Sequence, residues 1–149
     1  MKKLVIFDFD GVFIDTLDIK TLQTLKGLLK SLCDRYILAI ISSTSNSTIK
    51  KILEKEKVLP YFEDILGFEN YTSKVVRIKM LLEKYKVAPK DAVYITDTLG
   101  DILGGNECQI NSVGVTWGFN DRKTLEKGNP AVIIDDPRDL IAVVDSVLK

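Results

Sequence analysis

The chain has 149 residues, of which 46% are hydrophobic, and its 21 basic residues balance its 21 acidic ones. This length and composition predict one domain with a sizeable core. The even charge balance argues against a nucleic-acid or anionic membrane partner, because no net field would attract either. Without histidine, the chain has no histidine triad, no histidine general base and none of the usual histidine zinc sites.

Two further features bear on where the protein works. No apolar run approaches the ~20 residues that span a bilayer, and no leader segment precedes the first predicted strand. Cys33 and Cys108 lie far apart at apolar positions of predicted helices. That arrangement is typical of buried thiols in a reducing compartment rather than of a disulfide or a metal pair. We therefore expect a cytoplasmic protein with no membrane partner.

Short apolar runs alternate with helical patterns along the whole chain. Six runs have the character of strands: Leu4–Phe9, Tyr36–Ile41, Ile65–Phe68, Ala92–Ile95, Val113–Trp117 and Ala131–Ile134. Between them, apolar residues recur at spacings of three and four, as in the helix expected at Lys74–Tyr85. This alternation predicts an α/β fold, a doubly wound parallel sheet of about six strands, with residues 1–149 forming a single domain.

The first strand ends in two carboxylates, Asp8 and Asp10, followed by Gly11. Ligands gather at the carboxyl ends of strands in open α/β sheets. Alternation along the strand should turn both carboxylates to one side, where their charges repel unless a cation or a proton intervenes. Gly11 permits backbone conformations that a side chain forbids and lets a ligand approach closely. The alternative is an acidic turn or a helix cap.

Two further candidates follow along the chain. The second strand ends at Ser42 and Ser43, and hydroxyls with free N–H groups just before a helix make an anion cradle. Serine-rich turns also cap helices, so this motif is weak alone. Lys74 opens the third helix, where a cation opposes the helix dipole, so local structure gives no reason for it. The alternative for Lys74 is an ordinary surface lysine.

Asp97 and Asp101 follow the fourth strand, four residues apart. They span a strand end and the first turn of a helix, so their carboxylates can converge on one point. The alternative is that one of them caps the helix and the other acid interacts favourably with the helix dipole. If the fourth strand lies beside the first, up to four carboxylates share one crevice. A hard divalent cation makes such a cluster tolerable, and oxygen ligands favour Mg²⁺.

Together, the motifs Asp8-Phe9-Asp10-Gly11-Val12, Ser42, Lys74 and Asp97 with Asp101 resemble the four motifs of the haloacid dehalogenase superfamily of phosphohydrolases, in order. The stretches Val113–Phe119 and Ala131–Leu140 are similar to its phosphoglycolate-phosphatase-like branch. The resemblance implies a Mg²⁺-dependent phosphomonoester hydrolase that forms an aspartyl-phosphate. A non-catalytic domain that retains the fold is the alternative.

The resemblance also implies a role for each matched residue. Asp8 would be the nucleophile and a metal ligand, and Asp10 the general acid and base, with its carbonyl on the metal. Ser42 and the N–H of Ser43 would hold phosphate oxygens beside Gly11. Lys74 would neutralise Asp8 and the phosphoryl group. Asp97 would bind Mg²⁺ directly, with Asp101 binding it or orienting its water.

The chain departs from the family pattern in two ways. Thr96 stands where a small residue, usually glycine, precedes the metal-binding aspartate, so packing behind Asp97 should differ. Only 31 residues separate Asp10 from Ser42, and 31 separate Ser42 from Lys74, which leaves no room for a cap domain. We therefore expect a capless form. Its substrate would be a small phosphorylated metabolite, with a phosphorylated macromolecule as the alternative.

The segment after the catalytic pair, Val12–Leu17, contains Phe13, Ile14 and Leu17, which a cap would otherwise bury. One interpretation is that they fold back onto the domain's own helices. The other is an exposed apolar patch that meets substrate or a second subunit, as contiguous apolar surface often does. We expect the second, and hence a homo-oligomer through this flap near Phe13.

Overall fold

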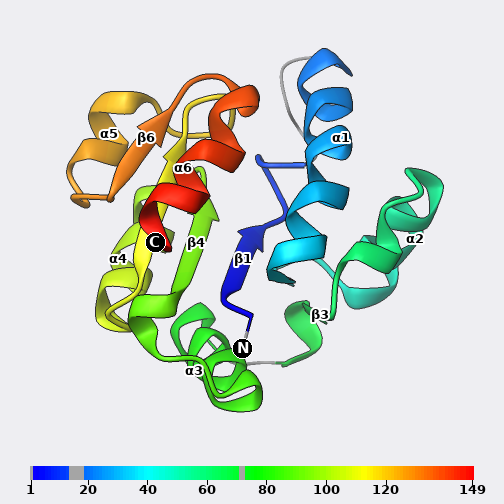
Figure 1. Cartoon of the computed structure of the whole chain (residues 1–149), viewed down its shortest axis with the longest axis horizontal. Helices are drawn as coiled ribbons and strands as arrows, with labels where there is room; N and C mark the ends of the chain where they lie inside the picture. The colour runs from blue at the N-terminus through cyan, green and yellow to red at the C-terminus, as the bar shows by residue number, and fades with distance from the viewer. Residues whose placement is uncertain (1, 14–18, 71–72) are drawn as a thin grey trace.

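The sheet at the centre of the molecule has six parallel strands in the order β3-β2-β1-β4-β5-β6 (Figure 1). The computed structural model describes residues 2–13, 19–70 and 73–149. The strands are β1 (Leu4–Asp8), β2 (Ile37–Ile41), β3 (Asp64–Leu66), β4 (Ala92–Thr96), β5 (Asn111–Val115) and β6 (Val132–Ile134). The predicted doubly wound sheet is confirmed, and so is the predicted pairing of the first and fourth strands.

Helices cover both faces of this sheet. On one face lie α1 (Ile19–Arg35), α2 (Asn46–Lys55) and α6 (Leu140–Val147), which share a core that includes Leu29, Ile49 and Val144. On the other face lie α3 (Lys74–Tyr85) and α4 (Leu99–Glu107), with a second core that includes Ile78 and Leu81. The short helix α5 (Arg122–Glu126) packs against α4 and β6. Within the described ranges, every strand belongs to this one sheet.

Side-chain alternation along β1 decides where its terminal carboxylate points. Val5 and Phe7 belong to the core shared with α1, whereas Leu4 and Ile6 belong to the core beneath α3. Since successive residues of a strand face opposite sides, Asp8 continues the Leu4–Ile6 series. It therefore faces α3, whose first residue is Lys74.

Short local signals set several element boundaries. The Ser45 hydroxyl accepts a hydrogen bond from the Thr48 N–H and begins α2. Helix α3 runs over the predicted Lys74–Tyr85. The fifth strand, in contrast, ends two residues earlier than predicted, at Val115. Trp117 leaves the strand, and its Nε1 donates to the carbonyl of Val12 across the sheet edge.

The expectation of an exposed flap at Phe13 is wrong. Its side chain is only 3% exposed and packs against the rings of Phe7, Phe9 and Phe62. Aromatic burial of this kind outweighs exposure at a partner surface, because it removes a large apolar area from water within the domain itself. Ile14 and Leu17 lie outside the described residues, so the homo-oligomer stays a prediction without Phe13 in it.

Candidate active site

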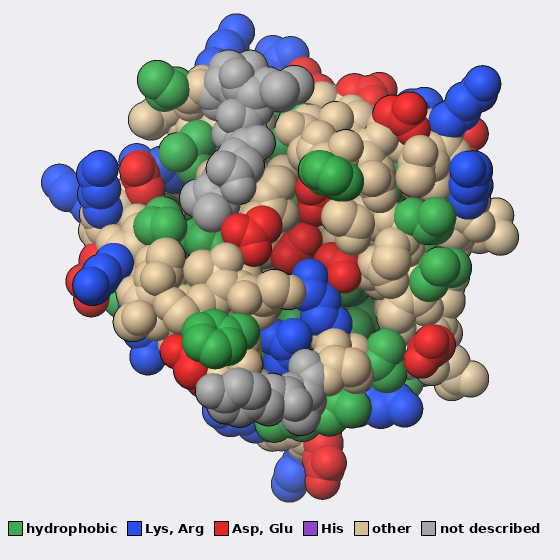
Figure 2. Space-filling model, turned by 180° about the vertical axis from the view of Figure 1, so that it is seen from behind, with side chains coloured by type: hydrophobic (Ala, Val, Ile, Leu, Met, Phe, Trp, Pro, Cys, Tyr) green, Lys and Arg blue, Asp and Glu red, His purple; other side chains and the backbone are tan. Residues whose placement is uncertain are grey.

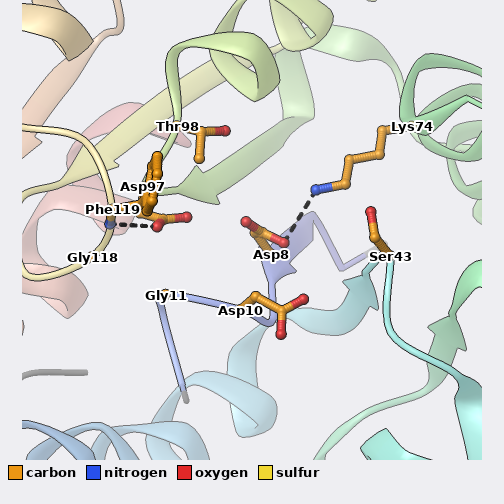
Figure 3. Close-up of a pocket in the computed structure, with 9 residues that line it drawn as sticks. All are labelled: Asp8, Asp10, Gly11, Ser43, Lys74, Asp97, Thr98, Gly118 and Phe119. Atoms are coloured by element: carbon orange, nitrogen blue, oxygen red, sulfur yellow. Dashed lines mark hydrogen bonds and ion pairs between the residues drawn. The ribbon is translucent and has the colours of Figure 1, made fainter. Parts of the chain in front are cut away.

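A cavity of about 430 Å³ opens at the carboxyl edge of the sheet, where strand order reverses between β1 and β4. Open α/β sheets bind their ligands at this switch point. The cavity is lined by Asp8, Asp10, Gly11, Ser43, Lys74, Asp97, Thr98, Gly118 and Phe119 (Figure 3). Figure 2 shows acidic side chains in the hollowed centre of this face, with basic side chains directly beside them. The predicted motifs therefore meet in one place.

Asp8 is the central group of the cavity, between Asp97 and Lys74 (Figure 3). It is 3% exposed, and its Oδ1 lies 3.3 Å from Nζ of Lys74. Nζ of Lys74 also donates to Oδ2 of Asp101 at 3.0 Å. The interpretation of Lys74 as a surface lysine is therefore excluded, because its ammonium bridges the buried carboxylate of Asp8 and the partly buried carboxylate of Asp101.

The balance of charge in this cluster is unfavourable to the ionised form of Asp8. Burial raises the pKa of Asp8 to about 9, and Asp101 and Asp97 add to the effect while Lys74 opposes it. Burial disfavours the charged form of Lys74 too, but Asp8 and Asp101 outweigh this and raise the pKa of Lys74. The cluster thus holds more negative charge than its single lysine offsets, which is the situation a bound cation would relieve.

Asp97 is held from three sides by main chain. Gly11 has a φ of +80°, and a Cβ there would lie 1.9 Å from Oδ2 of Asp97. A Cβ at Gly118 would lie 2.4 Å from the Cβ of Asp97. The N–H of Phe119 donates to Oδ2 of Asp97 at 2.7 Å. The close approach that Gly11 permits is therefore to the Asp97 carboxylate, in addition to whatever ligand enters the cavity.

Asp10 lies beyond the end of β1 and is oriented by hydroxyls from the loop after β2. The hydroxyl of Ser42 donates to Oδ2 of Asp10 at 3.1 Å. The Thr44 hydroxyl lies 3.2 Å from Oδ1 and 3.1 Å from Oδ2. Asp10 thus faces these donors while Asp8 faces Lys74. The two carboxylates open onto one cavity, as predicted, but each has its own set of partners.

Ser42 and Ser43 have different places in the site. Ser42 is fully buried, and its hydroxyl, which donates to Asp10, also accepts from the Thr44 N–H at 3.0 Å. Ser43, and not Ser42, lines the cavity. The structure therefore brings Ser43 to the position from which a ligand can be contacted, and Ser42 to the position behind it. The predicted phosphate contact of the Ser42 hydroxyl stays a prediction.

Asp101 lies behind Lys74 and does not line the cavity. Its Oδ2 accepts from Nζ of Lys74 and, at 2.9 Å, from the hydroxyl of Thr96. Thr96 is therefore more than a bulkier residue in place of glycine, because its hydroxyl turns Asp101 toward the lysine. The predicted metal contact of Asp101 stays a prediction, and in this arrangement its carboxylate fixes the ammonium of Lys74.

Asp8 and Asp97 are the side chains best suited to hold a divalent cation. Oδ1 of Asp97 is buried without a hydrogen-bond partner among the described residues, which is rare for a buried carboxylate oxygen. In the part of the chain that the structure describes, no three acidic or cysteine side chains are arranged to hold a metal. Mg²⁺ commonly takes only one or two carboxylates and keeps several waters. The residues present therefore fit Mg²⁺, with a main-chain carbonyl such as that of Asp10 and solvent as further ligands.

Sequence reasoning missed three residues that line the cavity, Thr98, Gly118 and Phe119. Thr98 caps α4, with its hydroxyl accepting from the Asp101 N–H. Gly118 and Phe119 come from the loop after β5, far from the motif residues in sequence. Gly118 carries a signal, since a glycine in or next to a strand often marks a place where a ligand or another part of the chain approaches closely.

Comparison with known proteins identifies the group to which these features belong. Residues 18–115 match the family model described as haloacid dehalogenase-like hydrolase, so Asp8 and Asp10 lie outside the matched part. A phosphoglycolate phosphatase from Vibrio parahaemolyticus is 27% identical over 112 residues, covering 73% of this chain and 49% of the relative. A pyrophosphatase from Oceanobacillus iheyensis is 26% identical over 120 residues, covering 78% of this chain and 56% of the relative.

The chain thus spans about half the length of the curated relatives it matches. Among solved structures, a haloacid dehalogenase-like hydrolase from Streptococcus pneumoniae superposes with a TM-score of 0.78 at 20% identity, covering 95% of this chain and 98% of the other. This likeness shows a shared fold. These names do not identify the substrate of this chain, because relatives of similar sequence identity are named for different activities.

Proposed function

Because the chain belongs to the haloacid dehalogenase-like hydrolases, we propose that it is a Mg²⁺-dependent phosphomonoesterase that works through an aspartyl-phosphate on Asp8. One observation carries this proposal. Asp8 lies buried at the switch point beside Asp97, whose Oδ1 has no partner among the described residues, with Lys74 on its other side. A carboxylate in such a place is a competent phosphoryl acceptor once its charge is balanced.

Each residue of the cavity has a part in the proposed reaction. An oxygen of Asp8 attacks phosphorus and the bond to the leaving oxygen breaks, while Asp10 gives that oxygen a proton. In the second half, Asp10 takes a proton from a water that attacks the phosphorus, and inorganic phosphate and free Asp8 result. Lys74 offsets the charge of Asp8 and of the phosphoryl group throughout. Bound Mg²⁺ would supply charge neutralisation on the phosphoryl oxygens and their alignment with Asp8.

The metal requirement provides the test of this proposal. Hydrolysis of p-nitrophenyl phosphate by the purified protein should need Mg²⁺ and fall to background in excess chelator. Mg²⁺ should also raise the melting temperature, as any ligand that binds only the folded state does. Ca²⁺ should raise it as well but support little turnover, because its larger and looser coordination misplaces the nucleophile. Full activity in excess chelator would contradict the proposal.

We propose a small phosphorylated molecule as the substrate class. The cavity is sized for one, at about 430 Å³. Most of its lining is charged, hydroxylated or glycine, which suits the phosphoryl group. Phe119 is the exception: its side chain is 86% exposed, and its N–H is fixed on Asp97. The ring therefore stands at the mouth of the cavity, where the rest of a substrate would lie.

Phe119→Ala should discriminate between substrates with and without an apolar group. We expect the KM for p-nitrophenyl phosphate to rise by about 3- to 10-fold, the usual worth of one aromatic contact, with kcat nearly unchanged. The KM for a small polar phosphomonoester should not change. Leu103→Ala, which removes another exposed apolar side chain outside the cavity, is the matched control. Equal changes for both substrates would mean that the ring only supports the Asp97 loop.

We also propose that the protein works in a reducing compartment such as the cytoplasm. Cys33 and Cys108 are both free thiols. Cys33 lies half-buried in α1, where its thiol donates to the carbonyl of Lys30, and Cys108 is buried at the end of α4. Thiols persist in this form where disulfides are not favoured. None of the described helices is long and apolar enough to cross a membrane.

A further inference from the structure

Arg77 is the most buried basic side chain that the proposed mechanism leaves without a role. It lies on α3, three residues after Lys74, and is 5% exposed. Residues three apart share a helix face, so both side chains reach the same edge of the sheet from beneath. Lys74 ends at the carboxylates of the cavity, and Arg77 ends one layer behind it.

Among the described residues, the hydrogen bonds of the Arg77 guanidinium all go to main-chain carbonyls at the carboxyl ends of β2 and β3. Its Nη1 donates to the carbonyls of Ser42 at 2.7 Å, Leu66 at 2.9 Å and Gly67 at 3.2 Å. The Leu66 carbonyl also accepts from the Ser42 N–H at 3.0 Å. Ser42 is thus fixed at its N–H, its carbonyl and its hydroxyl together.

Such an arrangement is costly if its only purpose is stability. Burial lowers the pKa of Arg77, and its Nε has no hydrogen-bond partner within the described part of the chain. Among the described residues, Nη1 donates to carbonyls and to no carboxylate. Apolar residues of similar volume commonly stabilise a protein as well as buried charges do. The position of the guanidinium, rather than its charge pairing, is therefore the feature to explain.

The shortest of the three contacts determines the direction of one peptide group. In a trans peptide, the carbonyl of one residue and the N–H of the next point to opposite sides. Since the Ser42 carbonyl is turned to Arg77, the Ser43 N–H of the same peptide points away from it. Ser43 lines the cavity, and among the described residues its N–H donates to no other residue. Figure 3 shows Ser43 at the edge of the space beside Asp8 and Lys74, where a phosphoryl group would sit.

We infer that Arg77 is a positioning residue that turns the Ser43 N–H into the cavity as a donor to a bound phosphate or phosphomonoester. This inference rests on the proposed function, because it assigns a support to its phosphate subsite. Arg77 does not touch the ligand. It acts through the Ser42–Ser43 peptide, so its loss should weaken the binding of the anion and leave the carboxylates that would hold Mg²⁺ in place.

Two affinities measured by calorimetry test this inference. In Arg77→Met, the affinity for inorganic phosphate at saturating Mg²⁺ should fall by about 10- to 100-fold, the worth of one hydrogen bond to a charged group. The affinity for Mg²⁺ alone should not fall, because removing a nearby positive charge favours a cation. Lys79→Met, which removes an exposed charge from the same helix, should change neither affinity.

Arg77→Lys distinguishes an effect of the orientation of the Ser42–Ser43 peptide from an effect of the charge of Arg77. It also provides the test if Arg77→Met fails to fold. Lysine keeps the charge but lacks the planar fork of donors, so phosphate affinity should still fall, by about 3- to 10-fold. Wild-type phosphate affinity in folded Arg77→Lys would overturn the inference. An equal loss of phosphate and Mg²⁺ affinity in Arg77→Met would also overturn it, because such a loss indicates that the whole site has collapsed. Wild-type protein that binds phosphate but hydrolyses no ester would refute the proposed function and leave this inference intact.

Discussion

Asp8→Asn should abolish turnover, lowering kcat for p-nitrophenyl phosphate by at least about 10⁴-fold, the scale on which the loss of a nucleophile acts. The amide that replaces the carboxylate has almost the same shape, but it cannot attack phosphorus at a useful rate. Acid quenching during turnover should trap phosphate covalently on the wild-type chain and none on the variant. Turnover at the wild-type rate would exclude Asp8 as the nucleophile.

The same variant should keep its fold, and this separates lost chemistry from lost structure. Asp8 is buried in a cluster whose negative charges exceed the charge of Lys74, so a neutral side chain removes repulsion. The melting temperature without added metal should not fall, whereas the stabilisation by Mg²⁺ should shrink because one ligand is weaker. Asp135→Asn, at an exposed carboxylate paired with Arg122, should leave both activity and the Mg²⁺ effect unchanged.

Asp10→Asn should slow turnover by roughly 10²–10⁴-fold, the usual contribution of a general acid and base. The Ser42 and Thr44 hydroxyls both reach Oδ2 of Asp10, so an asparagine amide oxygen in that place can still accept from both. What is lost is the proton that the leaving oxygen needs. Transfer of the phosphoryl group to Asp8 should therefore slow much more with an alkyl phosphate, whose leaving oxygen needs the proton, than with an aryl phosphate.

Pre-steady-state kinetics distinguishes this role from a structural one. The variant should still release p-nitrophenolate in an initial burst, because that leaving group departs without a proton, and then stall at hydrolysis of the aspartyl-phosphate. An alkyl phosphate should show no burst. Equal slowing of the first step for both substrates would contradict the role of Asp10 as acid and would indicate that it only orients neighbouring groups.

Much of the fold could be predicted from sequence because its signals are local. Strands buried on both faces appear as continuous apolar runs, and helices with one buried face repeat at three and four residues. Helix α3 shows this at the level of its boundaries, because it runs over the predicted Lys74–Tyr85. The residue types of the site could be found the same way, since ligands of an open α/β sheet gather where its strands end. Asp8 is the last residue of β1, and Ser43 and Asp97 follow β2 and β4.

Which partner each side chain takes was decided only by the tertiary structure. Phe13 lies in a segment that is apolar in sequence, and only the positions of Phe7 and Phe62 show that its ring is buried within the domain. Asp101 was expected to bind the metal or to orient its water, which stays a prediction, and only the structure shows that its carboxylate accepts from the Thr96 hydroxyl and from Lys74. Such outcomes depend on distances between residues far apart in the chain, which no local pattern contains.

The sequence by itself therefore determined the class of fold, the order of its elements and the chemical types that meet at the switch point. Hydrophobic periodicity and residue chemistry are properties of short segments, so they are visible without coordinates. The tertiary structure alone decided that Gly11, Gly118 and the Phe119 N–H enclose Asp97, and that Arg77 turns the Ser42–Ser43 peptide. Steric exclusion and hydrogen bonding act at contact distance, and chain folding creates those contacts.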